Sequence, residues 1–241
     1  MNQTLQYGDA HIAYRVFFVP KMRHKIAIHV HPDGSVQVDA PEATSMAEVK
    51  AAVAQKARWL SAQLDRIDRR HRHLSPREYV SGESHLYLGR RYLLKVLESS
   101  HETAGVKLRC GQLQVTTGHT DGKSVKSLLW HWYRCHAHTL FEQRLEGLCR
   151  ELSWVGNKPN WRLLPMKKQW GSCSPKGVIS VNTHLIKAPA ACIDYVLLHE
   201  LCHLKWHNHG PGFYRLLRST MPEWESVKNR LDGMAELLLN E

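Results

Sequence analysis

The sequence predicts an α+β protein with a strand-rich N-terminal half and a mostly helical C-terminal half. Short alternating apolar segments, separated by glycines and prolines, dominate the first half of the 241 residues, as is typical of strands. Longer stretches with apolar residues at helical spacing dominate the second half. We therefore expect a strand-rich region over 1–120 with one long helix, and a second domain over 121–241. No internal repeat is evident in the sequence.

The N-terminal half begins with a predicted sheet. Residues 11–39 alternate between apolar and polar side chains in three segments, HIAYRVFFV, KIAIHVH and SVQVDA. The sequence PDG at 32–34 supplies a turn between the second and third segments. We expect these segments to pair as an antiparallel sheet.

A long helix and a second group of strands follow. Ser45 and Glu48 have the spacing of a capping box, in which each side chain accepts a hydrogen bond from the other residue's backbone. This predicts a helix over about 45–69. Residues 78–117 contain further alternating segments punctuated by glycines, and we expect them to form strands.

The C-terminal half begins with a predicted helix over 121–152. Its leucines and tryptophans recur at helical spacing, whereas its histidines do not form an i, i+4 pair on one face. We therefore interpret the histidines of this helix as surface or partly buried polar residues. They are His131, His136 and His138.

Two strands and further helices complete the chain. RLLPMK and GVISVNTHLI are expected to be strands joined by a tight turn, QWGSCSPKG. Pro189 then suits the first position of a helix that contains the sequence HELCH. The sequence GPG at 210–212 ends that helical region, and a last helical region is interrupted near Met221.

The composition is that of an ordinary globular protein. Hydrophobic residues make up 43% and charged residues 23% of the chain, and no apolar run approaches the roughly 20 residues of a membrane span. The N-terminus lacks the basic-then-apolar pattern of a secretory signal. The six cysteines are scattered without a CxxC pair, which argues against a zinc ribbon and a disulfide framework. We expect a cytoplasmic protein with no membrane contact.

The chain is basic, with a formal net charge of +11 and a pI near 9.5. Lysines and arginines cluster at 21–25, 68–73 and 166–170. Such a charge is compatible with a polyanionic partner such as nucleic acid, bound through the basic surface. A solvated basic surface is the simpler interpretation, because no recognised nucleic-acid-binding motif accompanies the charge.

The sequence HELCH, residues 199–203, predicts a metal site. His199 and His203 are four residues apart and lie on one side of a helix, while the neighbouring residues YVLLHELCHL are almost wholly apolar. Burying two imidazoles and a carboxylate without partners is costly, and a divalent cation removes that cost. Glu200 is then placed to act on a water molecule at the metal as a general base. The alternative is a pair of histidines that are hydrogen-bonded within the core.

A catalytic zinc ion requires a third protein ligand and one open position. His209 is the favoured candidate, because GPG ends the helix and lets the chain turn back to the metal. His207 lies eight residues past His199, about 12 Å along a straight helix, which is too far. Glu223 and Glu225 are the remaining candidates, because some zinc peptidases use a carboxylate as the third ligand.

Several motifs together resemble one family. RLLPMKKQWGSCSPKGVISVNTHLI, IDYVLLHELCHLKWHNHGPGFYRLL and MPEW, in this order, are similar to the YgjP-like metallopeptidases, which are akin to the SprT-like and WLM zinc peptidases. KIAIHVHPDGSVQVDAP, ARWL and GESHLYLGRRY extend the resemblance more weakly over the N-terminal half. It implies a zincin-like C-terminal metallopeptidase core, with a sheet edge facing the motif helix. It also implies zinc ligands His199, His203 and His209, with Glu200 as the catalytic base.

These observations favour a zinc-dependent metallopeptidase that hydrolyses peptide bonds of protein or peptide substrates. A metal-activated water would attack the scissile carbonyl, and Glu200 would transfer the proton to the leaving amine. The strand over 178–182 is a candidate for holding an extended peptide by strand addition. Asn182 and Tyr214 are candidate substrate-binding residues. Cys173 has no histidine partner by spacing and is not expected to be a nucleophile.

Two other functions stay open. The kinship to SprT-like proteins and the basic charge allow a nucleic-acid-associated protease, whose DNA binding would fall steeply with ionic strength. A non-catalytic zinc-binding module would use the same three histidines structurally. Glu200 argues against this second alternative, because a structural site needs no base beside an open metal position.

Overall fold

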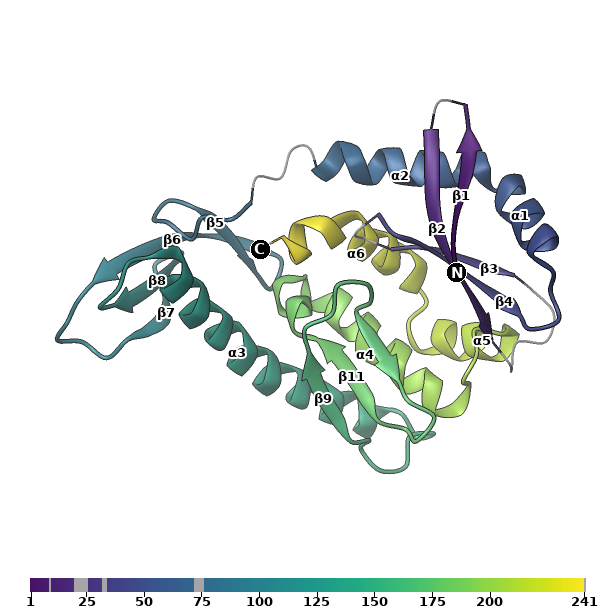
Figure 1. The fold of residues 1–241 in the computed structure, drawn as a ribbon. Coiled ribbons are helices and arrows are strands. Elements are labelled where there is room, and N and C mark those ends of the chain that lie inside the picture. The colour runs from purple at the N-terminus through teal and green to yellow at the C-terminus, as the bar shows by residue number, and fades with distance from the viewer. Residues whose placement is uncertain (9, 20–25, 32–33, 72–75, 241) are drawn as a thin grey trace. The chain divides into compact units, whose positions relative to one another are not determined.

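The structure is a computed structural model of the 241-residue chain, and it describes residues 1–8, 10–19, 26–31, 34–71 and 76–240. The described residues form six α-helices, a short 3₁₀ helix and three sheets, so the chain is α+β as predicted. The chain divides into two compact units, residues 1–75 and residues 76–241. The predicted boundary near residue 120 lies inside the second unit. Figure 1 shows the elements of both units.

The first unit contains a four-stranded sheet in the order β1-β2-β4-β3, and two helices. The central strands β2 and β4 are parallel, while both outer pairs are antiparallel. The prediction of an antiparallel sheet was therefore wrong for the central pair, because the chain forms the outer strand β3 before it returns between the two as β4. The elements are β1 (Asn2–Tyr7), β2 (Ala10–Val19), β3 (Ala27–Val30), β4 (Val36–Pro41), α1 (Met46–Gln55) and α2 (Ala57–His71).

Alternation along these strands gives the first unit its own core. Alternate residues are buried over 12–16 of β2 and along the whole of β4, and these side chains pack against valines of α1. The predicted capping box is confirmed: Ser45 Oγ accepts from the Glu48 backbone N–H, and a Glu48 carboxylate oxygen accepts from the Ser45 N–H at 2.7 Å. The predicted helix over 45–69 is interrupted at Lys56, which separates α1 from α2. Residues 32 and 33 of the predicted PDG turn lie outside the described residues.

The second unit begins with a sheet of the same topology. Its order is β5-β6-β8-β7, with β6 and β8 parallel in the centre and antiparallel pairs at both sides. The fold therefore repeats an arrangement that no sequence repeat indicated. A helix follows this sheet as well, and its N-terminus is capped by Asp121. The elements are β5 (Ser84–Tyr87), β6 (Arg90–Glu98), β7 (Gly105–Arg109), β8 (Gln112–Thr117) and α3 (Gly122–Glu151).

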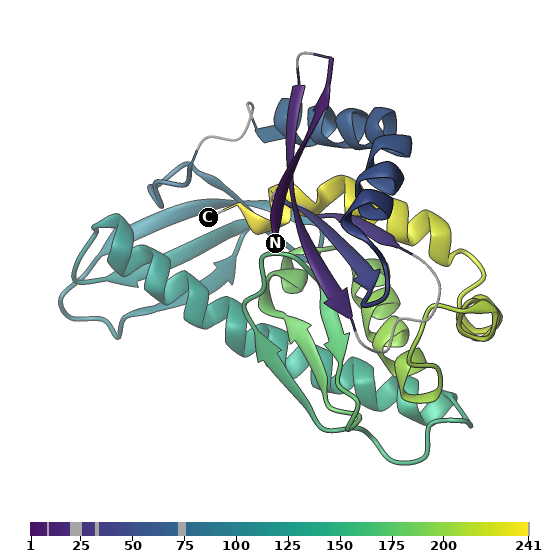
Figure 2. The same cartoon turned by 45° about the vertical axis from the view of Figure 1, so that its right-hand side comes forward.

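The helix α3 connects this sheet to the rest of the second unit (Figure 1). Near its middle, the Tyr133 hydroxyl donates a hydrogen bond to the Leu86 carbonyl of β5 at 2.7 Å. Nearer its C-terminus, Arg144 forms an ion pair with Asp194 of α4 at 2.8 Å. Figure 2 shows the same helix from a second direction, running from the β5–β8 sheet along the remaining elements.

A three-stranded sheet of order β10-β11-β9 and the C-terminal helices complete the unit. β9 and β11 are parallel, and β10 is the antiparallel outer strand. The predicted tight turn QWGSCSPKG was wrong in part, because GSC forms the strand β10 and only the residues after it make the turn. The elements are β9 (Trp161–Leu164), β10 (Gly171–Cys173), β11 (Ile179–Asn182), the 3₁₀ helix η1 (Thr183–Lys187), α4 (Ala190–Lys205), α5 (Pro211–Thr220) and α6 (Trp224–Leu239).

The helix α4 lies in the core of the second unit. It contacts α3, α5, α6 and the strands β10 and β11, and most of its residues are buried, as its apolar sequence predicts. The second unit thus has a hydrophobic core of its own, and the HELCH sequence lies within it. Among the described residues, none of the helices combines the length and the apolar character that a membrane span requires.

Candidate active site

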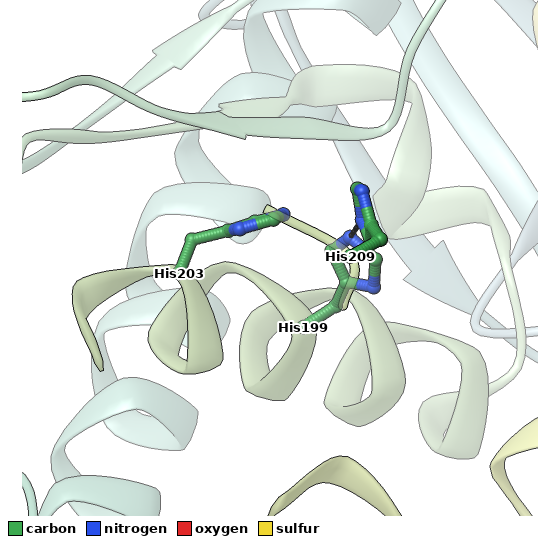
Figure 3. Close-up of side chains that lie close together, drawn as sticks. All are labelled: His199, His203 and His209. Carbon is green, nitrogen blue, oxygen red and sulfur yellow. Dashed lines mark hydrogen bonds between the residues drawn. The ribbon is translucent and has the colours of Figure 1, made fainter. Parts of the chain in front are cut away.

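Three histidines converge beside α4. His199 and His203 project from the same side of the helix, one turn apart, and His209 approaches them from the connection to α5 (Figure 3). The helix ends at Lys205, and α5 starts only at Pro211, so the intervening residues can turn back. One nitrogen from each ring lies within 4.8 Å of the other two.

The spacing of these nitrogens fits a single metal ion. The Nε2 atoms of His199 and His209 are 3.0 Å apart. Two nitrogens bound tetrahedrally to one zinc ion would be about 3.3 Å apart, because each Zn–N bond is near 2.0–2.1 Å. Nδ1 of His203 lies 3.0 Å from the carbonyl oxygen of Trp206 and can donate to it. That hydrogen bond leaves Nε2 of His203 with a free lone pair for a metal.

The protonation of these imidazoles also suits metal binding. Burial, together with the neighbouring His203, His209 and Lys228, lowers the pKa of His199 to about 3. Burial also lowers the pKa of His203. Both rings are therefore neutral near pH 7, the state in which histidine donates a lone pair to a cation.

Glu200 lies buried next to this cluster. Only 4% of the residue is exposed, and its Oε2 atom has no hydrogen-bond partner among the described residues. Burial raises the pKa of this carboxyl to about 8. Without a cation this group would therefore be protonated near pH 7, and a nearby divalent cation would favour the charged carboxylate that a general base requires. Three convergent imidazoles beside a carboxylate outside their converging group match the donor set of a catalytic zinc site.

The glycine of WGSCS gives Glu200 its space. A Cβ atom on Gly171 would lie 2.6 Å from Oε1 and 2.7 Å from Cγ of Glu200. The strand β10 therefore packs directly against the carboxylate, and a side chain at this position would displace it. We expected Gly171 only to shape a turn, and the sequence alone did not show that it faces Glu200.

Phe213 supports all three histidines, and the sequence analysis missed it. The side chain is fully buried, and its ring centroid lies 4.9, 4.7 and 4.6 Å from those of His199, His203 and His209. Its position four residues after His209, beyond the GPG sequence, was the available signal. A single aromatic side chain thus packs against every ring of the cluster.

A pocket of about 390 Å³ opens over the histidines and Glu200. His207 lines this pocket, but the group whose nitrogens converge contains His209 instead. Glu225, which was a candidate for the third metal ligand, forms an ion pair with Arg218 at 2.9 Å and is outside the converging group. The pocket is lined by Gln169, Gly171, Ser172, Cys173, Pro175, His199, Glu200, His203, His207 and His209.

The two candidate substrate-binding residues occupy different environments. Asn182 is 0% exposed, and its amide nitrogen donates to the carbonyls of Met166 and Gln169 at 2.7 and 2.9 Å. A substrate could contact Asn182 only if the segment 166–169, to which its amide is hydrogen-bonded, moved away. Tyr214 is 39% exposed, and its ring stacks on Trp224 with centroids 5.4 Å apart, close to His209.

The strands next to the pocket differ in their free edges. β11, which contains Asn182, is paired on both sides, so it has no edge to offer to an extended peptide. β10 is an outer strand of this sheet, and like β11 it contacts α4. Cys173 lies in β10, and burial and the neighbouring Glu200 raise the pKa of its thiol. A raised pKa is the opposite of what an activated cysteine nucleophile needs.

Comparison with solved structures finds two metallopeptidase zymogens among the similar chains. Abylysin of Pyrococcus abyssi is 25% identical, with a TM-score of 0.36, over 40% of this chain and 94% of that chain. Jannalysin of Methanocaldococcus jannaschii is 24% identical, with a TM-score of 0.34, over 38% of this chain and 92% of that chain. No curated protein matches the sequence.

A comparison with protein families gives a match over most of the sequence. The family described as YgjP-like, metallopeptidase domain, matches residues 24–234. The match includes all residues of the histidine cluster, Glu200 and the pocket. A metallopeptidase of this family requires a divalent metal, and the convergent histidines supply a place for it. The chain therefore belongs to the YgjP-like metallopeptidase family.

Proposed function

We propose that the protein is a zinc-dependent peptidase in which His199, His203 and His209 hold the metal and Glu200 is the general base. The observation that carries this proposal is the convergence of three imidazoles beside the buried Glu200 side chain in one pocket. All four residues lie within the region 121–241 that we expect to be the metallopeptidase domain. The helix α4 packed against the outer strand β10 supports a zincin-like core.

The residues of the chain have distinct roles in the proposed reaction. When bound, a zinc ion supplies Lewis acidity toward a water molecule and the scissile carbonyl. Glu200 accepts a proton from the water on a carboxylate oxygen and then donates it to the nitrogen of the leaving amine. The hydrogen bond between His203 and the Trp206 carbonyl, and the packing of Phe213, keep the imidazoles in place.

An extended substrate has one suitable strand to pair with. β10 presents its outer edge beside the pocket, so we propose that the peptide backbone pairs with Gly171–Cys173. This replaces the strand over 178–182 as the site of strand addition. Tyr214 remains a candidate donor to the developing oxyanion because it is exposed next to His209. Asn182 supports the site indirectly, through the backbone at 166–169.

Metal content tests the ligand set. Elemental mass spectrometry is expected to find about one zinc ion per chain in the wild type and much less in His209→Ala. His207→Ala is the matched control, because His207 lines the same pocket outside the converging group, and it should keep its zinc. A wild type that stays metal-free after zinc is added would refute the proposal.

Glu200→Gln tests the mechanism separately. The glutamine has nearly the same shape but cannot accept the proton, so zinc should be retained while peptide hydrolysis falls by about 10²–10⁴-fold. Undiminished hydrolysis by this variant would exclude Glu200 as the base. Loss of zinc in this variant would instead assign Glu200 to the metal ligands.

A further inference from the structure

The part of the chain that forms the candidate active site is strongly basic. Between Glu151 and Glu223 the sequence contains nine lysines and arginines but only two acidic residues, Asp194 and Glu200. Asp194 is ion-paired with Arg144 at 2.8 Å, and Glu200 is buried against β10. Neither carboxylate therefore balances the positive charge at the surface of this region.

Four exposed lysines adjoin the pocket. Among the residues that the structure describes, none of these four forms an ion pair with a carboxylate, whereas Lys158 and Arg218 of the same region do. Their charges therefore face solvent. We name these four residues the basic rim: Lys167, Lys168, Lys176 and Lys205.

The basic rim flanks both ends of β10. Lys168 precedes Gln169, and Lys176 follows Pro175, and both of these neighbours line the pocket. The hairpin that contains Lys176 also meets the C-terminal end of α4, because a Cβ atom on Gly177 would lie 3.5 Å from the Leu204 side chain. Lys205 ends α4, next to Leu204 and hence near the hairpin that contains Lys176, while Lys167 and Lys168 lie in the segment before β10.

We infer that the substrates are acidic peptide segments, with aspartates and glutamates on both sides of the scissile bond. This inference rests on the proposed peptidase function. A peptide paired with β10 advances about 3.3 Å per residue, so side chains a few residues from the scissile bond reach the rim. The pocket between is lined by four histidines and by residues of the β10 segment, and Glu200 is the one acidic residue among the described residues of its lining. Lysines around a cleft raise the local concentration of anionic ligands.

The expected preference follows from the ion pairs that such a peptide would form. An exposed ion pair contributes about a two- to five-fold change in affinity. If the pairs act independently, four lysines would together favour an acidic peptide over a neutral one by about 16- to 600-fold. Salt screens exposed charges, so raising the ionic strength should remove most of the difference.

Binding to zinc-loaded Glu200→Gln tests the inference without turnover. Fluorescence anisotropy would compare three labelled peptides of equal length, one acidic, one neutral and one basic, at about 0.05 and 0.3 M salt. The acidic peptide is expected to bind tightest at low salt. The double variants K167E/K168E and K176E/K205E should each weaken its binding by about 4- to 25-fold. The control K95E/K107E makes the same charge change on β6 and β7 and should have little effect.

The outcomes separate this inference from the proposed function. Equal binding of the three peptides, or equal losses in the rim and control variants, would overturn the inference. If the wild type then still cleaved peptides, the peptidase function would stand without the substrate preference. Selective binding of the acidic peptide without cleavage by the wild type would refute the proposed function and leave the binding site. Tighter binding of a single-stranded oligonucleotide than of the acidic peptide would assign the rim to nucleic acid instead.

Discussion

The sheets β1–β4 and β5–β8 are built alike but lie in different units of the chain. In both, two parallel strands form the centre and pair through valines at matching positions, Val16 with Val38 in the first sheet and Val96 with Val115 in the second. In both, the last central strand leads to a helix with a side-chain cap at its N-terminus. The sheet β5–β8 belongs to the same compact unit as the candidate active site, residues 76–241.

The length of the following helix accounts for the difference. α1 has 10 residues and ends close to its own sheet, whereas α3 has 30 residues and extends to Arg144, which pairs with α4. The third sheet, β9-β11-β10, has the same arrangement as β2-β4-β3 and β6-β8-β7: two parallel strands, then an antiparallel outer strand. The strand that comes last in the sequence, β11, lies in the middle and leads through η1 to α4. The helix that presents the histidines thus occupies the place that α1 and α3 take in the other two sheets.

The outer strands of two sheets offer the sharpest test of this comparison. Gly171 lies in β10, where a Cβ atom would meet Glu200 at 2.6 Å, and Gly105 lies in β7, where nothing is within 4 Å. Gly171→Ala should displace Glu200 and reduce peptide hydrolysis by at least about 100-fold, the size of a lost general base. Zinc should be retained, because the histidines are not displaced. Steady-state kinetics and metal content are the measurements.

Gly105→Ala is the matched control and should leave hydrolysis unchanged. If both alanine variants were fully active, the close contact between β10 and Glu200 would have no catalytic importance. If Gly171→Ala lost its zinc as well, the strand would be shown to support the whole cluster rather than the base alone.

A buried histidine gives the second sheet a pH dependence. His85 is 3% exposed, and burial and the Arg77 guanidinium lower its pKa from 6.5 to about 4, although Glu83 accepts a hydrogen bond from it at 2.9 Å. The unfolded chain binds a proton below about pH 6.5, and the folded chain does not. The free energy of unfolding therefore has its full value above about pH 6.5. It decreases as the pH falls toward 4, by up to about 3 kcal/mol from this histidine.

The residue that corresponds to His85 in the first sheet suggests a substitution that tests this pH dependence. Leu5 in β1 pairs with Ile12 as His85 in β5 pairs with Tyr92, so His85→Leu makes the second sheet resemble the first. Urea unfolding at pH 7 and pH 4.5 should show a smaller loss of stability for the variant than for the wild type. Equal losses in the two proteins would mean that His85 is not the source.

Much of this fold could be predicted from local patterns. The capping box at Ser45 and the helical spacing over 121–152 each depend on neighbouring residues, and the structure contains both helices. The parallel pairing of β2 with β4 could not be predicted in this way. Alternation shows that a strand has one buried face, but it does not show which strand lies beside it.

The candidate site likewise has one part that local sequence spacing predicts and another that depends on how distant segments pack. His199 and His203 are one helical turn apart, so the sequence alone brings them together. The contact between Gly171 and Glu200 joins residues that are far apart in the sequence, and it depends on how β10 packs against α4. Phe213 was missed for a similar reason, because an apolar residue after a turn does not reveal that it meets three rings.

Equivalent core positions should give similar losses of stability but different effects on the site. Val38 and Val115 are both 0% exposed at matching places in their sheets. Changing either to alanine should cost about 2 kcal/mol, because two buried methyl groups are lost and a cavity remains. Hydrogen exchange would report the stability of each unit. Val115→Ala should weaken protection in β8, α3 and α4, and Val38→Ala only in residues 1–75. Weakened protection of α4 in Val38→Ala would contradict the division into two units.

The smallest expected effect is that of removing the first unit on zinc binding. Every residue of the histidine cluster, its supporting Phe213 and the pocket lies in residues 76–241, which have their own large core. A protein of residues 76–241 should therefore bind about one zinc ion with an affinity within about two-fold of the full chain, because the three histidines and the Phe213 ring that packs against them all lie in this unit. Competition with a zinc chelator would measure this, and circular dichroism would show whether the shortened protein is folded. A folded fragment with much weaker zinc binding would show that the first sheet, despite its separate core, contributes to the site.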